Sequence, residues 1–172
     1  MGDISDPNGF APETWHPATR QLYEYWLSIR PPVGLPGRQH VDPAAIRTLL
    51  PYVFIVDVSR QPLRFHYRLV GTAYRELMGC DLTGAYFDMV HPGFTGAIKR
   101  HYIEAVEQRR PAYRKGRAMH AREDRRWPMV ERVITPLAKN GVDVDMILGA
   151  IVQLTVGTEP GRDASERAPQ LK

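Results

Sequence analysis

Residues 65–84 read FHYRLVGTAYRELMGCDLTG, and the hydrophobic pattern changes its period in the middle of this stretch. At its start Phe65, Tyr67 and Leu69 alternate with more polar residues, which is typical of a β-strand with one aromatic and apolar face. From residue 72 the apolar residues are spaced as on a helix, and a glycine ends that helix. The stretch therefore predicts a strand that passes directly into a short helix.

The glycines of this stretch argue against a phosphate-binding loop. Gly71, Gly79 and Gly84 are eight and five residues apart, whereas a phosphate-binding loop clusters its glycines before one helix. Asp81 and Thr83 have side chains that bind backbone amides in a capped turn. We therefore interpret the stretch as a strand and helix wall that is closed by a turn.

The neighbouring sequence predicts the other elements of a sheet. Residues 53–58 are a continuous apolar run, which indicates a buried strand that pairs with residues 65–70 as an antiparallel hairpin. A weak helical segment covers residues 86–90, and the longest internal helix is predicted over 95–109. Three more strands are expected over 113–122, 127–138 and 146–156. This order predicts an α+β fold, in which a five-stranded antiparallel sheet has a helical crossover on one face.

A flanking N-terminal helix is predicted within residues 14–31, before the sheet begins. Its apolar stripe has more aromatic surface than one short helix usually hides against its own domain. We therefore expect a homodimer, in which a partner subunit covers the stripe. The interface candidates are Trp15, Leu22, Trp26 and Ile29.

The remaining segments set the domain boundaries. Asp42 is a good N-cap and predicts a short helix that ends near Leu50. Residues 1–13 and 157–172 are poor in apolar groups, and we expect both to be disordered tails. The folded domain is expected over residues 35–156.

Composition places the chain among soluble globular proteins. Its 172 residues are 43% hydrophobic and 24% charged, and no apolar run approaches the roughly 20 residues that a membrane-spanning helix needs. The first ten residues lack the features of a secretory signal, so a cytoplasmic location is expected. A single cysteine, Cys80, excludes an internal disulfide.

The positive charge is concentrated between Lys99 and Arg132. This segment contains eleven Lys or Arg residues but only five Asp or Glu residues. Such a block suits phosphates, an acidic protein or an anionic surface. A basic nucleic-acid-binding adaptor is one alternative function, but few aromatic residues are interleaved with the basic ones for base stacking, and nucleic acid is not the expected partner. The candidate surface for an acidic partner consists of Arg109, Arg110, Arg114 and Arg117.

Three blocks of the chain resemble a known family. They read LPGRQHVDPAAIRTLLPYVFIVDV, FHYRLVGTAYRELMGCDLTGAYF and ITPLAKNG…ILGAIV. They are similar to a bacterial family of stand-alone PAS-like domains in the PAS superfamily. The resemblance implies a non-catalytic sensory or regulatory module in signal transduction, which binds a small molecule between sheet and helices or associates with a protein. No output domain follows residue 156 in this sequence, so we expect a separate signalling protein as partner.

A ligand pocket is expected between the sheet and the crossover. Apolar side chains would line it, with a few directional polar groups among them. The same residues could instead simply fill the core. The pocket candidates are Phe65, Tyr67, Leu69, Tyr74, Leu77, Met78, Phe87, Val133, Thr135, Leu148 and Ile151. Whether Arg68 faces the interior depends on whether its strand contains a bulge.

Cofactor and catalytic signatures are weak, and the cofactor is unknown at this stage. No two histidines have the spacing of a zinc-hydrolase motif, so no metal site is predicted. Haem would need an axial ligand such as His91 or His101. Cys80 lies in MGCDLTG, which does not match the motif of flavin photosensors. No catalytic residue is assigned; the enzymatic alternative is a cone-shaped α+β lyase or isomerase with an Asp/His pair in its pocket.

Overall fold

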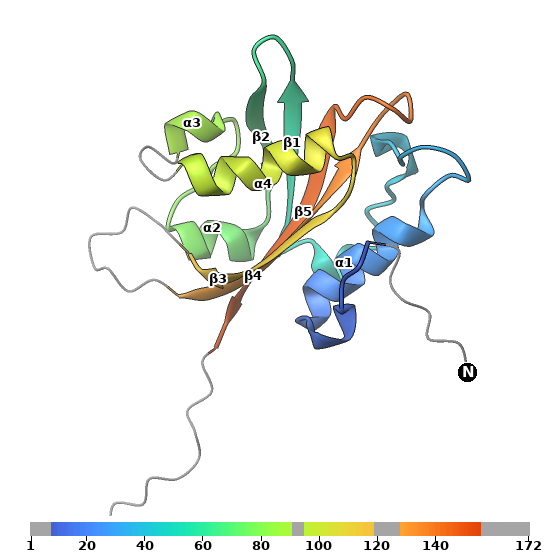
Figure 1. Cartoon of the computed structure of the whole chain (residues 1–172). Coiled ribbons are helices and arrows are strands. Elements are labelled where there is room, and N and C mark those ends of the chain that lie inside the picture. Colours follow the sequence, from blue (N-terminus) through green and yellow to red (C-terminus); the bar gives the residue numbers. More distant parts are fainter. Residues whose placement is uncertain (1–7, 91–94, 119–127, 156–172) are drawn as a thin grey trace, which may run out of the picture.

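A five-stranded antiparallel sheet runs through the middle of the molecule, as the order of the predicted elements indicated. The computed structural model describes residues 8–90, 95–118 and 128–155 (Figure 1). The strand order is β2-β1-β5-β4-β3, so β2 and β3 are the two edges. The strands are β1 (Val53–Ser59), β2 (Arg64–Val70), β3 (Ala112–Arg117), β4 (Met129–Leu137) and β5 (Met146–Leu154).

The helical crossover between β2 and β3 covers one face of this sheet, which we call the crossover face (Figure 1). Its helices are α2 (Thr72–Met78), α3 (Phe87–Val90) and α4 (Thr95–Glu107). Helix α2 ends as predicted, because Gly79 takes the left-handed conformation with φ of 73° and closes the last turn. The predicted α+β fold with a crossover on one face is confirmed.

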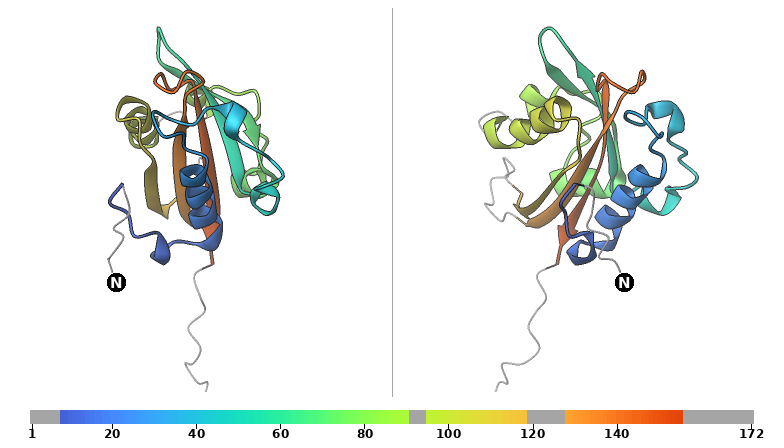
Figure 2. Two further views of the ribbon diagram at one scale, coloured as in Figure 1. Left: turned by 90° about the vertical axis from the view of Figure 1, so that its right-hand side faces the viewer. Right: turned by 45° about the vertical axis from the view of Figure 1, so that its right-hand side comes forward.

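Helix α1 (Pro17–Ser28) packs on the opposite face of the sheet, against β4 and β5, and we call this the α1 face (Figure 2). Pro17 occupies the first turn, where its missing N–H leaves no hydrogen bond unmade. The ring of His16 accepts a hydrogen bond from the Ala18 N–H at 3.2 Å and caps the helix. Since helices cover both faces, the central strands β4 and β5 are buried along almost their whole length.

The packing of α1 corrects the predicted interface. Trp15, Leu22 and Trp26 are only 7%, 0% and 1% exposed, because the chain's own sheet covers them. The indole N–H of Trp26 donates to the Pro136 carbonyl oxygen at 2.9 Å. Ile29 is half-buried and packs against the same core. The reason for expecting a partner subunit over this stripe was therefore wrong.

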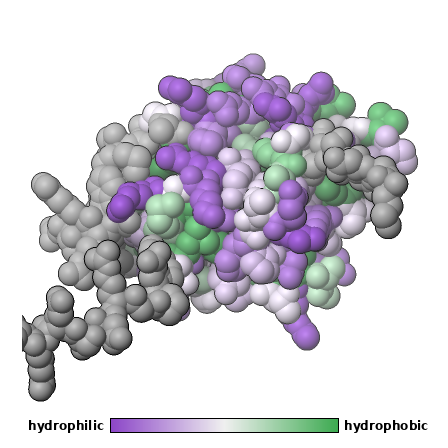
Figure 3. Space-filling model, turned by 60° about the horizontal axis from the view of Figure 1, so that its bottom comes forward, coloured by the Kyte–Doolittle hydropathy of each residue, from purple (hydrophilic) through white to green (hydrophobic). Residues whose placement is uncertain are grey.

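The surface of the molecule agrees with this burial. On the side that comes forward when the molecule is tipped up from below, hydrophilic side chains predominate and hydrophobic ones form small separate patches (Figure 3). Among the described residues, the large hydrophobic side chains that remain exposed are scattered over several elements. They are Val33, Leu50, Leu69, Met89 and Val142.

The N-terminal segment is more ordered than its composition suggests. Phe10 lies within the expected tail, yet its ring packs against Trp15 at 5.4 Å and against Tyr23 at 5.8 Å between ring centroids. Trp15 in turn stacks on Tyr113 of β3 at 4.0 Å. Residues 1–7 and the C-terminal segment from residue 156 lie outside the described residues.

Two predicted elements are shorter in the structure. The segment after Asp42 forms turns and then only a short 3-10 helix, Arg47–Leu49, and Pro51 follows directly after its end at Leu50. The Asp42 carboxylate still caps locally, accepting from the Ala44 N–H at 2.9 Å. Strand β3 ends at Arg117. The predicted strand continued to residue 122, and the next predicted strand began at Trp127. Residues 119–127 lie outside the described part of the chain.

Candidate ligand site on the crossover face

Alternation along β4 assigns its side chains to the two faces of the sheet. The guanidinium of Arg132 lies 5.3 Å from the centre of the Tyr102 ring of α4, so Arg132 is on the crossover face. Its neighbour Glu131 accepts hydrogen bonds from Thr19 and from the backbone N–H of His16, so Glu131 is on the α1 face. The cross-strand pairs then place Ile151, opposite Arg132, on the crossover face.

Three predicted pocket residues lie on the wrong face. Val133, Thr135 and Leu148 are all buried, but they share the α1 face with Glu131. The hydroxyl of Thr135 donates to the Leu148 carbonyl oxygen at 2.8 Å and is satisfied there. The sequence does not reveal which residues of these strands point to which face, because strands buried on both faces show no alternation of polar and apolar residues.

Leu69 is a fourth wrong assignment, and a β-bulge explains it. The register pairs Ile55 with Leu69 and Val56 with Tyr67, which leaves Arg68 as the extra residue of β2. The bulge turns Leu69 away from the interior, where it is 43% exposed, and Val70 takes the inward position. Arg68 faces solvent and donates to the Asp57 carboxylate at 3.2 Å.

The other candidates do gather on the crossover side. Phe65, Tyr67, Tyr74, Leu77, Phe87 and Ile151 are buried there, and Met78 is half-buried against the same core. Phe54 and Tyr102, which we had not assigned, complete the group. Phe54 lies 5.2 Å from Tyr74, and Tyr102 lies 5.1 Å from Phe87 and 5.4 Å from Phe65, between ring centroids. The result is one continuous cluster of aromatic rings.

The three tyrosines of this cluster bring hydroxyl groups into the apolar interior. The hydroxyls of Tyr67 and Tyr74 are 3.2 Å apart and share a hydrogen bond. The hydroxyl of Tyr102 is buried and has no hydrogen-bond partner among the described residues. Burial raises the pKa of all three, so each remains a neutral phenol that can donate a proton in a hydrogen bond.

Arg132 adds a positive charge beside these hydroxyls. It is only 8% exposed, and among the described residues no carboxylate forms an ion pair with it. The pKa of His101 on α4 is lowered, mainly by burial and then by the positive charges of Arg132 and Arg114. We call Tyr67, Tyr74, Tyr102 and Arg132 the tyrosine–arginine cluster. Its donors can bind a polar or anionic group, while the rings around it can hold an apolar one.

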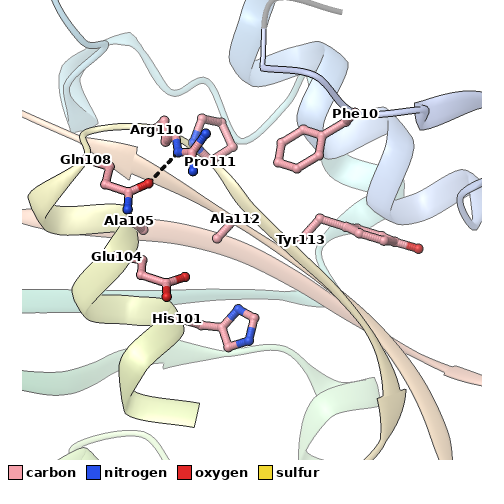
Figure 4. Close-up of a pocket in the computed structure, with 9 residues that line it drawn as sticks. All are labelled: Phe10, His101, Glu104, Ala105, Gln108, Arg110, Pro111, Ala112 and Tyr113. Carbon is pink, nitrogen blue, oxygen red and sulfur yellow. Dashed lines mark hydrogen bonds between the residues drawn. The ribbon is translucent and has the colours of Figure 1, made fainter. Parts of the chain in front are cut away.

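A separate surface pocket, with a volume of about 150 Å³, lies between the C-terminal half of α4 and the start of β3 (Figure 4). His101 and Glu104 line one side of it, and Phe10 and Tyr113 line the other. The side-chain oxygen of Gln108 accepts from the Arg110 Nε–H at 2.6 Å at its rim. The pocket is open to solvent and polar on one side, unlike the buried cluster.

Of the residues considered for cofactors, the two that the structure describes do not lie in the cluster. His101 lines the surface pocket, and His91 lies outside the described residues. Cys80 is exposed just beyond the end of α2 and is not among the buried residues of the cluster. Within the described ranges, no group of three His, Cys, Asp or Glu side chains is arranged to hold a metal ion.

Comparison with known families agrees with this architecture. A family model described as PAS domain matches residues 14–152, most of the chain. The chain belongs to the PAS domain family. PAS domains are sensory modules, and as a class they are generally non-catalytic. The predicted resemblance is confirmed. No helix in the described part of this PAS domain is long and apolar enough to cross a membrane.

Several solved structures are similar to the chain at low sequence identity. The LOV protein of Rhodobacter sphaeroides is 15% identical with a TM-score of 0.49, over 81% of this chain and 69% of that one. A PAS domain from Colwellia psychrerythraea is 23% identical with a TM-score of 0.45, over 66% of this chain and 98% of that one. The LOV domain of a blue-light activated histidine kinase from Erythrobacter litoralis is 17% identical with a TM-score of 0.46, over 61% and 97%. No curated protein matches the chain significantly.

Proposed function

We propose that this PAS domain is a non-catalytic regulatory module that binds a small molecule at the tyrosine–arginine cluster and signals to a separate protein. The observation that carries the proposal is the Tyr102 hydroxyl, which is buried without a partner among the described residues. Nearly all buried polar groups in proteins are hydrogen-bonded, and leaving one unpaired costs about 1–3 kcal/mol. A bound molecule that accepts a hydrogen bond from Tyr102 removes this penalty.

The position of the cluster suits a sensor. Tyr102 belongs to α4 and Arg132 belongs to β4, so a molecule that contacts both bridges the crossover and the sheet. A ligand shifts a conformational equilibrium only through its different affinities for the two states. Binding between these elements therefore favours the arrangement in which α4 is packed closely on the sheet.

The output surface that fits this proposal is the edge strand β3. Lys115 and Arg117 are exposed and Arg114 is half-buried, so the strand presents positive charge at the sheet edge. An acidic surface on a signalling protein would complement it. Because β3 follows α4 directly in the chain, a shift of α4 reaches this edge through a short connection.

The two alternative functions have less support. The Asp57 and His66 pair, 3.5 Å apart, is solvent-accessible on the face away from the cluster, so it does not supply the Asp/His pair of a lyase or isomerase pocket. For nucleic-acid binding, Tyr102 is buried and Tyr113 stacks on Trp15, so neither ring is free to stack on a base.

Native mass spectrometry of freshly purified protein tests the proposal. We expect a fraction of the wild-type protein to carry a small molecule that denaturation releases, and Tyr102→Phe to retain less of it. Tyr86→Phe is the matched control, because Tyr86 lies at the β2 edge outside the cluster. A molecule retained equally by all three proteins, or no binding by the wild type even from a metabolite extract, would contradict the proposed site.

A further inference from the structure

The charge balance around Arg132 points to the chemical class of the bound molecule, an inference that rests on the proposed function. A buried charge is normally paired, because taking an ion out of water costs several kcal/mol even after the protein relaxes. Among the described residues, the five ion pairs all lie elsewhere, at half-buried or exposed positions. The guanidinium of Arg132 lies over the Tyr102 ring as a cation–π pair at 5.3 Å, and its charge also acts on the Tyr67 and Tyr74 hydroxyls.

The neighbours of Arg132 increase the positive charge instead of balancing it. In the β3–β4 ladder Arg132 is directly opposite Arg114, and two like charges at such a position destabilise a sheet. His101 approaches from α4, and both arginines contribute to lowering its pKa. The adjacent carboxylate, Glu131, points to the other face and is used there by Thr19 and His16. The crossover face thus has a local excess of positive charge.

We propose that the bound molecule is a small monocarboxylate with a flat or aromatic body. The planar guanidinium of Arg132 matches a carboxylate and binds it through two parallel hydrogen bonds. The Tyr102 hydroxyl, which has no other partner among the described residues, donates a further hydrogen bond to it. Of the two arginines only Arg132 is buried, whereas Arg114 is half-buried and partly solvated, so one buried charge has to be neutralised, which favours a monoanionic carboxylate over a dianionic phosphate.

The aromatic rings around these donors indicate which apolar group the ligand would carry. Phe54, Phe65 and Phe87 surround the tyrosines at centroid distances of 5.1 to 6.4 Å. Rings at these distances favour edge-to-face or offset contacts with another flat group. A flat acid therefore meets a charged donor at one end and aromatic surface along its body.

Calorimetric titration with acid and amide pairs tests this class of ligand. The probes are benzoate and phenylacetate, each compared with its neutral amide, benzamide or phenylacetamide, and with inorganic phosphate. We expect at least one acid to bind the wild type about tenfold or more tightly than its amide, which corresponds to one charge-assisted pair. Arg132→Gln should remove this preference, whereas Arg100→Gln, which removes an exposed charge from α4, should keep it.

The variants also separate this inference from the proposed function. If the amides bind as tightly as the acids, and Tyr102→Phe weakens both, a ligand site exists but it is not selective for anions. If no probe binds and native mass spectrometry finds no small molecule, both proposals fail. If Arg132→Gln does not fold, Arg114→Gln is the replacement variant. It should lower the affinity for the acids about threefold and leave the affinity for the amides unchanged. Equal losses of affinity for acid and amide would overturn the inference.

Discussion

Glu131 and Arg132 are adjacent on β4, carry opposite charges and are both buried, yet they have opposite roles. Glu131 is 1% exposed on the α1 face, where it accepts from the His16 N–H at 2.7 Å and from the Thr19 hydroxyl. A carboxylate at the start of α1 is also stabilised by the helix dipole. Arg132, on the crossover face, has no carboxylate partner among the described residues.

The two faces of the sheet differ in whether their buried polar groups are hydrogen-bonded within the chain. On the α1 face the buried polar groups of Trp26, Thr135 and Glu131 all have hydrogen-bond partners within the chain. On the crossover face the Tyr102 hydroxyl and Arg132 do not complete such a network. Substitutions of the paired polar groups on the α1 face should therefore reduce stability, whereas substitutions of Tyr102 and Arg132 should mainly change binding.

The largest expected effect comes from Trp26 on the α1 face. Trp26→Ala should lower the free energy of unfolding by about 3–5 kcal/mol, because it leaves a cavity between α1 and the sheet. Urea denaturation measures this loss, and Val33→Ala, at a position that is 88% exposed, is the control. A folded Trp26→Ala protein of unchanged stability would show that α1 does not pack as described.

Glu131 should give the next largest effect. Glu131→Ala removes the charged acceptor of two hydrogen bonds, which should cost about 2–3 kcal/mol of unfolding free energy. It leaves the His16 N–H unpaired, whereas the Thr19 hydroxyl keeps the His16 carbonyl oxygen as an acceptor. Glu107→Ala, at an exposed position on α4, should change stability by less than about 0.5 kcal/mol. Similar losses in the two variants, in urea denaturation, would remove the contrast between the faces.

The crossover face should respond differently to loss of a hydroxyl. Tyr102→Phe should leave the stability of the ligand-free protein unchanged or raise it by about 1 kcal/mol, because it removes an unpaired buried group. Tyr74→Phe should lower stability by about 1 kcal/mol, since it breaks the hydrogen bond with Tyr67. Thermal unfolding of ligand-free protein compares them; a larger loss in Tyr102→Phe would mean that its hydroxyl is satisfied.

A smaller effect is expected from pH through His101. Burial, Arg132 on β4, Arg114 on β3 and Arg100 on α4 lower its pKa, against the opposing effect of Glu104. The native state therefore binds the proton less well than the unfolded state, so stability is retained above pH 6.5 and falls as pH decreases from 6.5 toward the native pKa.

The comparison with His101→Gln makes this measurable. The variant should lose less stability than the wild type between pH 7 and pH 5, and should match it within about 0.5 kcal/mol at pH 8. Urea denaturation at each pH gives both curves. Parallel curves would show that His101 does not sense the positive charge of Arg132 and Arg114.

The smallest effect should be at the bulge of β2. Leu69→Ala should change stability by less than about 0.5 kcal/mol, because Leu69 is 43% exposed. Val70→Ala, one residue later and 1% exposed, should cost about 2 kcal/mol. If denaturation shows the reverse order, the strand has no bulge and Leu69 faces the interior.

Sequence reasoning found the elements more easily than it found the faces. The change of period near Thr72, the left-handed Gly79 and the apolar run of β1 predict the sheet and crossover because each follows from local chain chemistry. The phase of β4 was not accessible, since a strand covered on both sides is apolar throughout. The bulge at Arg68 arises from how β2 pairs with β1, and this pairing cannot be read from the residue pattern of β2 alone.

The site was found in part for the same reason. Tyr67, Tyr74 and Phe87 follow from the crossover pattern, whereas Arg132 reads as one more residue of a basic block until its neighbours are known. The stripe of α1 was visible in the sequence, but periodicity does not say which surface covers it.

Position 149 determines where the ring of Phe54 can lie. Gly149 lies opposite Phe54, and a methyl group added there would lie 2.3 Å from the tip of the Phe54 ring. That ring would have to swing toward Tyr67 and Tyr74, which it already touches. A single added carbon would thus press the Phe54 ring into the tyrosine–arginine cluster, so the missing side chain at position 149 is what allows the aromatic rings to pack as they do.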